Sequence, residues 1–238
     1  MRIIVYPDVE QLATGAADLI AQAIGLVPRM TLGLAGGNTP RRTYGMLRAR
    51  RLPWDQIDAW LADERWVPFE HPECNGAMAE EALFRHVPAR LHRIRWSPNA
   101  APDQAALAYE RVLHRILPRE GPRYRPDLVL LGLGDDGHTA SLFPGTAALD
   151  EEQRLYVANW VPRLDAWRLT ATLPLLQAAR TLVFLVAGQT KATAVRSVLS
   201  EGADLPVQRV TGGDGEAFWL LDEPAASELR DDLFERPE

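Results

Sequence analysis

Short apolar segments recur along this chain and alternate with longer segments whose apolar residues follow helical spacing. Five of the apolar segments are predicted to be buried strands, at residues 2–6, 30–35, 57–61, 128–133 and 181–187. Strands that are apolar on both faces are typical of parallel sheets covered on both sides, whereas half-exposed strands alternate in polarity. The sequence therefore predicts a three-layer α/β fold, a Rossmann-like, mostly parallel central sheet with helices on both faces.

The remaining segments complete this expected fold. Helices are predicted at residues 9–27, 40–50, 76–84, 102–117, 174–179, 190–199 and 223–234, and Asp8 is placed to cap the first of them. Residues 155–161 and 167–172 are expected to be extended, and residues 207–210 and 217–221 to finish the sheet. The stretch 118–126 is predicted to be a surface loop. Since the 238 residues contain no internal repeat or low-complexity tract, we expect a single domain, residues 1–238.

The net charge and the cysteine content limit which binding partners and which cellular compartment we expect for this protein. A net charge of −6 argues against non-specific binding of nucleic acid or an anionic membrane, but a locally positive site could still take an anionic small molecule. The single cysteine, Cys74, excludes an internal disulfide and fits a reducing compartment. No apolar run has membrane-spanning length, and the first ten residues do not resemble a signal peptide, so we expect a cytoplasmic protein, either monomer or homodimer.

Polar motifs directly follow four of the predicted strands, at residues 36–39, 63–65, 136–138 and 188–191. The carboxyl ends of parallel strands meet at one edge of a sheet, and open α/β sheets bind their ligands there. We therefore expect the four loops to converge on one site. Several converging loops indicate a site more strongly than any one loop alone.

The first of these loops resembles an anion cradle. Gly36 and Gly37 would let backbone N–H groups approach a ligand closely, and Asn38 or Thr39 could cap the helix that follows. Pro40 suits the first turn of that helix, whose amino end would attract a phosphate. The alternative is a plain glycine turn between a strand and a helix. The segment is neither a P-loop nor a dinucleotide-binding fingerprint.

Three cations are candidates for binding an anionic substrate. Arg65 could fork onto a phosphate or carboxylate, unless Asp63 or Glu64 neutralises it in a solvated charge cluster. Arg168 and Lys191 lie near the ends of apolar runs. A lysine at the beginning of a helix opposes the helix dipole, which makes a ligand-binding role reasonable for Lys191; the alternative is an ordinary surface lysine.

His138, in the segment LGLGDDGHTASLFPGT, is the candidate general base. The unperturbed pKa of a histidine is about 6.5, so it exchanges protons at neutral pH. Asp136 is placed to orient the imidazole or to stabilise its charge. The alternative is a histidine that only caps its loop.

Other chemistries find less support in the sequence. The other four histidines show no metal-ligand spacing with His138; they are His71, His86, His92 and His114. Ser141 does not lie in a G-x-S-x-G elbow, which argues against a serine hydrolase, and Cys74 is expected to be an inert thiol.

Five segments together resemble the 6-phosphogluconolactonase family in order and spacing: AGGNTPRRTY, ADERWVPFEHPECNGAMAEEALF, PDLVLLGLGDDGHTASLFPGT, RLTATLPLLQAAR and VAGQTKATAV. The resemblance covers nearly the whole chain, and GxGxDGHTASLFP is its most specific part. It implies a sugar-phosphate isomerase/deaminase-type fold and hydrolysis of 6-phospho-D-glucono-1,5-lactone to 6-phospho-D-gluconate in the oxidative pentose phosphate pathway. It also implies that no cofactor is needed and that the partner is a phosphorylated sugar lactone.

Two positions distinguish this chain from relatives. Several family members carry a serine where Cys74 stands, a swap of small side chains. The related deaminases carry a glutamate five residues after the histidine, where this chain has Phe143, and that acid works in ring opening. Lactone hydrolysis is therefore favoured over a sugar-phosphate isomerase or deaminase. A non-catalytic sugar-phosphate sensor would keep the cradle but could dispense with His138, and it would usually carry a DNA-binding module, which is not apparent here.

Overall fold

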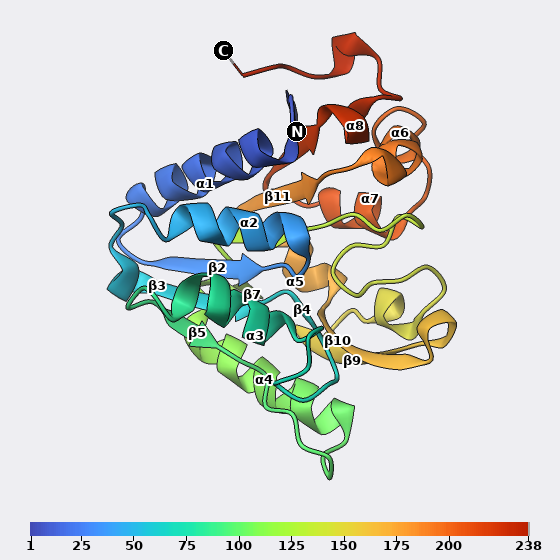
Figure 1. Ribbon diagram of the computed structural model, residues 1–238. Coiled ribbons are helices and arrows are strands. Elements are labelled where there is room, and N and C mark those ends of the chain that lie inside the picture. Colours follow the sequence, from blue (N-terminus) through green and yellow to red (C-terminus); the bar gives the residue numbers. More distant parts are fainter. Residues whose placement is uncertain (238) are drawn as a thin grey trace.

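The computed structural model describes residues 1–237, and its centre is a seven-stranded sheet (Figure 1). All neighbouring strands in this sheet run parallel. The order across the sheet is β1 (Arg2–Tyr6), β12 (Glu216–Asp222), β11 (Thr181–Val186), β8 (Leu128–Leu131), β2 (Met30–Leu34), β3 (Ile57–Leu61) and β5 (Arg90–His92). Every residue of β2, β3 and β8 is buried, as the unbroken apolar runs predict.

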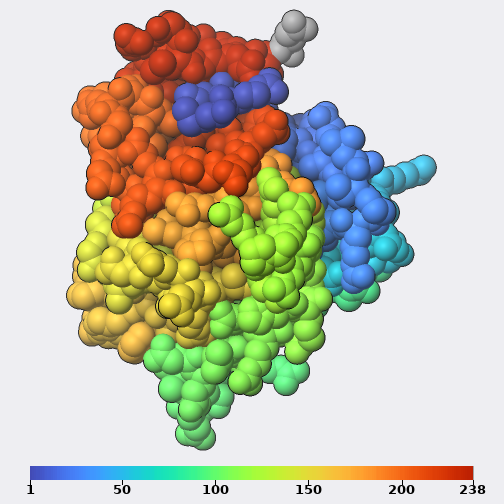
Figure 2. Space-filling view, turned by 180° about the vertical axis from the view of Figure 1, so that it is seen from behind, coloured from blue at the N-terminus to red at the C-terminus, as the bar shows by residue number. Residues whose placement is uncertain are grey.

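Helices cover the sheet on both sides. They are α1 (Val9–Gly25), α2 (Asn38–Leu47), α3 (Asn75–Ala79), α4 (Pro102–Ile116), α5 (Leu173–Gln177), α6 (Ala192–Leu199), α7 (Pro206–Thr211) and α8 (Glu223–Ala226). In Figure 1, α1 and α2 lie in front of the sheet, and in the view from behind the lime-green α4 segment is in front (Figure 2). Asp8 caps α1 as predicted, because its side chain accepts a hydrogen bond from Gln11 N at 2.8 Å. The predicted mostly parallel α/β fold is confirmed.

A second, antiparallel sheet adjoins the carboxyl end of β3. It consists of β4 (Asp63–Arg65), β10 (Ala166–Ala171) and β9 (Tyr156–Val161), with β10 in the middle. The strands at β9 and β10 were expected, but β4 and the short edge strand β5 were not. The predicted loop at 118–126 contains a small hairpin, β6 (Arg119–Glu120) and β7 (Arg123–Tyr124).

Two predicted elements are wrong. Residues 207–210 form no strand but belong to helix α7, because Pro206 starts a turn whose buried Val207 and Val210 lie on one helical face. The expected closing helix at 223–234 ends at Ala226. Beyond it the chain returns to the sheet edge, where Glu235 O accepts from Val5 N at 2.9 Å and Glu235 N donates to Ile3 O at 3.0 Å. Pairing with the free edge of β1 thus outweighs local helix propensity. Within residues 1–237, no helix combines the length and apolar character that crossing a membrane requires.

Candidate active site

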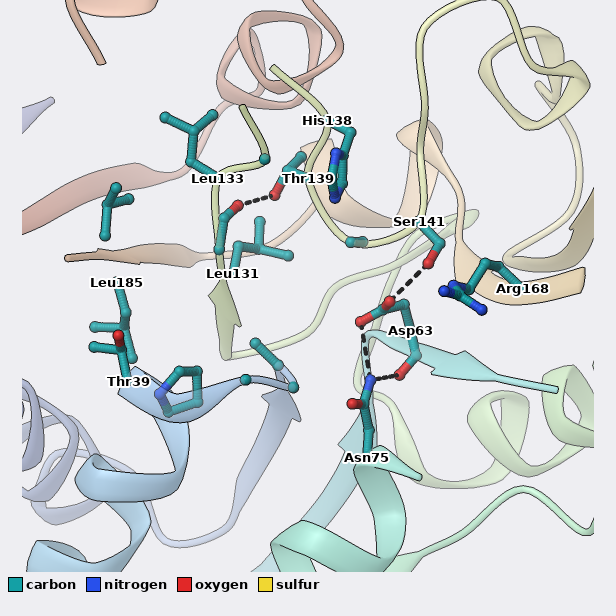
Figure 3. A pocket seen from close by; sticks show the side chains of 18 of the residues that line it. Thr39, Asp63, Asn75, Leu131, Leu133, His138, Thr139, Ser141, Arg168 and Leu185 are labelled. Atoms are coloured by element: carbon teal, nitrogen blue, oxygen red, sulfur yellow. Dashed lines mark hydrogen bonds between the residues drawn. The ribbon is translucent and has the colours of Figure 1, made fainter. Parts of the chain in front are cut away.

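A cavity of about 420 Å³ lies at the carboxyl ends of the adjacent strands β3, β2, β8 and β11. Loops after all four strands line it, so the structure brings the four predicted polar motifs to one rim. Leu131, Leu133 and Leu185 supply apolar lining (Figure 3). The predicted residues in its wall are Gly36, Gly37, Asn38, Thr39, Arg65, Arg168, Lys191 and His138.

The loop after β2 leads into the amino end of α2. Gly37 has a φ of +105°, a conformation that favours glycine, and it is itself the residue that precedes the helix. The prediction that Asn38 or Thr39 caps α2 is wrong, because the helix begins at Asn38, Gly37 precedes it, and no side chain of the described residues caps its first turn. A Cβ on Gly36 would lie 1.9 Å from Asn75 Oδ1, so glycine permits this close approach. The first-turn N–H groups and the positive end of the α2 dipole therefore remain available to an anion.

Arg65 and Arg168 lie opposite each other on the neighbouring strands β4 and β10. Arg65 Nη1 donates to the Glu73 backbone oxygen at 2.8 Å, and within residues 1–237 neither arginine forms an ion pair with a carboxylate. The alternative in which Asp63 or Glu64 neutralises Arg65 is therefore wrong. Burial, and next the charge of Arg65, lower the pKa of Arg168. Two adjacent cations without an ion-pair partner among residues 1–237 make this wall attractive to an anion, although the charges of Asp63, Glu73 and Glu64 act on Arg168.

Lys191 reaches the cavity from the turn between β11 and α6. Its Nζ lies 2.5 Å from Asp135 Oδ1, in the loop that carries His138. Gly188 begins this turn with a φ of +98°, and its N–H donates to both Asp222 carboxylate oxygens at 2.9 and 3.0 Å. These hydrogen bonds anchor the turn to β12, and the contact with Asp135 holds Lys191 beside the loop that carries Asp136 and His138.

Two acids that follow β3 organise the wall. Glu64 is buried and accepts backbone hydrogen bonds from Arg65, Asn75 and Gly76 at 2.7–2.8 Å. Burial nevertheless raises its pKa. Asp63 accepts a hydrogen bond from Ser141 Oγ at 2.7 Å, and its backbone oxygen accepts one from Asn75 Nδ2 at 3.0 Å (Figure 3). Asp63 therefore ties the small sheet to the loop of His138.

Cys74 caps helix α3 beside Glu64. Its sulfur accepts from Ala77 N at 3.4 Å and donates to Glu64 Oε2 at 3.4 Å. Burial, followed by the nearby Glu64 charge, raises the pKa of Cys74 to about 11. The thiol is therefore protonated at neutral pH, which is unfavourable for nucleophilic attack.

His138 is held from three sides. Its Nδ1 lies 2.5 Å from Asp136 Oδ1, its ring stacks on Phe143 with centroids 4.0 Å apart, and Gly134 lies so close that a Cβ there would be 1.9 Å from Nδ1. Asp136 is not in the cavity wall but behind the imidazole. With Asp136 ionised, Nδ1 carries the proton and Nε2, which has no partner among the described residues, is the basic nitrogen.

The electrostatics of this pair favour a neutral imidazole. Burial lowers the pKa of His138 and outweighs the opposing effect of Asp136. For Asp136, burial acts to raise the pKa, but the hydrogen bonds and charge of His138, together with the charge of Arg163, lower it overall. At neutral pH the structure therefore presents a neutral base beside an ionised carboxylate.

Arg163 is a cavity residue that sequence reasoning missed. It comes from the tip of the β9–β10 hairpin, and its Nη1 lies 2.9 Å from Asp136 Oδ2. No local motif marks it, because its position depends on a hairpin of the second sheet reaching across to the first. Within the part of the chain that the structure describes, no group of three or more His, Cys, Asp or Glu side chains is placed to hold a metal ion.

Comparison with known proteins gives a consistent result over nearly the whole chain. A family model described as glucosamine-6-phosphate isomerases/6-phosphogluconolactonase matches residues 7–219. The 6-phosphogluconolactonase of Synechocystis sp. is 42% identical over 218 residues, covering 89% of this chain and 89% of that protein. The 6-phosphogluconolactonase of Homo sapiens is 32% identical, covering 94% and 92%. The solved structure of 6-phosphogluconolactonase from Trypanosoma brucei has a TM-score of 0.86 at 27% identity, covering 96% of this chain and 98% of that one.

Proposed function

The chain belongs to the glucosamine-6-phosphate isomerase/6-phosphogluconolactonase family and is an enzyme, a lactone hydrolase, and we propose how its residues perform the reaction. The substrate is 6-phospho-D-glucono-1,5-lactone and the product 6-phospho-D-gluconate, in the oxidative pentose phosphate pathway. One observation carries the mechanism: His138, held at Nδ1 by Asp136, lines the same cavity as two arginines that pair with no carboxylate among residues 1–237.

The substrate phosphate binds at the amino end of α2, on Gly36, Gly37, Asn38 and Thr39. Some of Arg65, Arg168 and Lys191 clamp it there. This placement is supported by the uncapped first turn of α2 and by the unneutralised pair Arg65–Arg168. Anchoring the phosphate orients the ring so that the lactone carbonyl carbon faces His138.

His138 acts as the general base. Nε2 takes a proton from a water molecule, and the oxygen of that water attacks the lactone carbonyl carbon. A cation or backbone N–H stabilises the negative charge on the carbonyl oxygen in the tetrahedral intermediate. As the bond from the carbonyl carbon to the ring oxygen breaks, protonated His138 returns its proton to that oxygen. Asp136 keeps the imidazole in the required tautomer and stabilises it while it is charged.

Arg65 binds either the substrate phosphate or the oxyanion of the tetrahedral intermediate, and kinetic measurements distinguish these two roles. A phosphate ligand contributes equally to substrate and transition-state binding, so its loss raises KM, whereas an oxyanion ligand lowers kcat when it is lost. Loss of one oxyanion donor costs about 10²- to 10³-fold in kcat. Steady-state kinetics of Arg65→Ala decide the assignment, and an unchanged kcat would remove the oxyanion role.

The proposal is tested by following the loss of 6-phosphogluconolactone generated in situ from glucose 6-phosphate, with spontaneous hydrolysis subtracted. We expect the wild-type protein to accelerate the loss and His138→Ala to be slower by at least about 100-fold while still folded. A wild-type rate equal to background would contradict the lactonase assignment. Equal rates for both proteins would leave the lactonase in place but remove His138 as its base. Ammonia release from glucosamine 6-phosphate would instead support the deaminase alternative.

A further inference from the structure

The tip of the β9–β10 hairpin reaches from the small sheet onto the loop of His138. A short turn, Pro162–Leu164, followed by Asp165 with a φ of +47°, reverses the chain between the two strands. This places Arg163 and Leu164 in the cavity wall. Nothing in the reaction described above assigns a task to Arg163.

Arg163 contacts both Asp136 and Phe143, two residues whose side chains contact the ring of His138. Asp136 Oδ1 lies 2.5 Å from His138 Nδ1, and Asp136 Oδ2 lies 2.9 Å from Arg163 Nη1. The Phe143 ring stacks on His138, and the Arg163 guanidinium carbon lies 4.9 Å from the centroid of the same ring. Rotation of the Asp136 carboxylate would therefore break its contacts to His138 and Arg163 together.

The contacts of Arg163 differ from those of the arginines proposed to bind substrate. Arg65 and Arg168 form no ion pair with a carboxylate among residues 1–237, so their charge is free to meet an anion. Arg163 is already paired with Asp136 and lies against the Phe143 ring. An arginine engaged in this way is better suited to hold a carboxylate in one orientation than to bind the substrate phosphate.

We infer that Arg163 is a positioning residue, which fixes the second oxygen of Asp136 and thereby holds the His138 ring with Nε2 available to the attacking water. The inference rests on the proposed role of His138 as the base. Positioning of this kind acts on the chemical step, because a small misplacement of a catalytic group costs rate even when the substrate still binds.

The charge of Arg163 adds a second, measurable consequence. Three charged groups act on His138: Asp136 from its own loop, Asp63 from β4 and Arg163 from the hairpin. Burial has the largest effect on the pKa of His138 and lowers it, the two carboxylates oppose that effect, and Arg163 lowers the pKa further. Removal of the Arg163 charge should therefore raise the pKa of His138 as long as Asp136 stays in contact with the imidazole.

The test uses the full-length protein with Arg163→Met, which removes the guanidinium charge and leaves an unbranched, uncharged side chain of similar length. We expect kcat to fall by about 10- to 100-fold with little change in KM, and the acid limb of the pH profile of kcat/KM to move to higher pH. Arg163→Lys, which keeps the charge, should restore the position of the acid limb. The matched control is Arg123→Met, because Arg123 pairs with exposed Asp214 at 3.3 Å outside the cavity and should leave both parameters unchanged.

A double-mutant cycle shows whether Arg163 acts through Asp136. In an Asp136→Ala background, Arg163→Met should lower kcat by less than about twofold, because the carboxylate that it positions is gone. Additive effects on kcat would overturn the inference, as would a raised KM with unchanged kcat, which would make Arg163 a substrate ligand.

A readout without substrate separates this inference from the proposed function. The ring nitrogens of His138 are followed by ¹⁵N NMR during a pH titration of the wild-type and Arg163→Met proteins. We expect the His138 titration to move to higher pH in the variant, and an unchanged titration would overturn the inference. If His138→Ala retained full lactonase activity while this shift occurred, the base assignment would fail and the contact between Arg163 and the pair would stand.

Discussion

Among residues 1–237, two histidines lie within hydrogen-bond distance of an aspartate, one near the amino end of β3 and the other beyond the carboxyl end of β8. His92 Nε2 lies 2.8 Å from Asp58 Oδ1 towards the amino end of β3, and His138 Nδ1 lies 2.5 Å from Asp136 Oδ1 beyond the carboxyl end of β8. The two histidine side chains are almost equally exposed, at 25% and 24%. Neither the hydrogen bond nor the exposure distinguishes a structural pair from a catalytic one.

The carboxylates and their surroundings make the difference. Asp58 is 2% exposed and also binds Arg29 at 2.7 Å and Arg90 at 2.9 Å, so three partners saturate it. Burial acts to raise the pKa of Asp58, but hydrogen bonds from Arg90, His92 and Arg29 outweigh it and hold the pKa well below its usual range. This cluster joins β3 and β5 and does not line the active-site cavity. The pair at the carboxyl rim differs because His138 lines a substrate-sized cavity, and this supports the catalytic role proposed for it.

The largest predicted effect separates the two histidines by activity. His138→Ala should lower kcat/KM by about 10²- to 10⁴-fold, because the base is lost, and should cost little stability. His92→Ala should keep kcat/KM within about threefold, since His92 does not line the active-site cavity and its imidazole is bound to Asp58, but should lower the free energy of unfolding by about 1 kcal/mol. Lactonase assays and urea unfolding of both variants measure the contrast. A comparable loss of activity in folded His92→Ala protein would contradict the distinction between a catalytic His138 and a structural His92.

The next largest predicted effect distinguishes the carboxylates of Asp136 and Asp58 by what their loss changes, activity or stability. Asp136→Asn should lower kcat by about 10- to 100-fold, because an amide at this position favours the wrong imidazole tautomer, with little change in stability. Asp58→Asn should instead cost about 1–3 kcal/mol of unfolding free energy, because the amide NH2 group would face an arginine donor in place of either oxygen, Arg90 at Oδ1 and Arg29 or Arg90 at Oδ2. The same assays and urea titrations apply. Equal losses of stability in the two variants would show that both pairs are structural.

A smaller effect concerns the dependence of activity on pH. Because the pKa of His138 lies below its usual value of about 6.5, the base should remain neutral as pH falls to that value and lose activity only below it. Asp136 acts to raise this pKa, so Asp136→Asn should move the acid limb of kcat/KM to still lower pH. Profiles of both proteins between pH 4.5 and 8 measure the shift. An acid limb that moved upward in the variant would contradict the electrostatic role of Asp136.

The central sheet and its rim could be predicted from sequence because local signals specify them. Apolar runs identified β2, β3 and β8, and polar residues at their ends indicated the loops that converge on the cavity. Residues 207–210 were misassigned because a segment with only two apolar positions is too short for their i, i+3 spacing to reveal a helical period.

The contacts that distinguish the two pairs could not be predicted in this way. Arg163 meets Asp136 from a different sheet, and His92 meets Asp58 across 34 residues of chain. Such contacts depend on how strands are ordered in space, whereas hydrophobic periodicity reports only which face of an element is buried. Sequence therefore predicted His138, Asp136 and the rim motif that contains Asp63, but not Arg163.

The smallest predicted effect tests whether nearness to the cavity is enough to make a residue functional. Glu64 lies at the carboxyl rim, yet three backbone N–H groups bind it, so it is saturated much as Asp58 is. Cys74 is protonated, since its pKa is raised to about 11, and it only caps α3 and donates to Glu64.

Cys74→Ser keeps both contacts, so kcat/KM should stay within about twofold and the unfolding free energy within about 1 kcal/mol. Cys74→Ala, which removes the cap, should cost about 1 kcal/mol without a loss of kcat. A large loss of kcat in folded Cys74→Ser protein would mean that saturation of a carboxylate does not separate structural from functional groups at this rim.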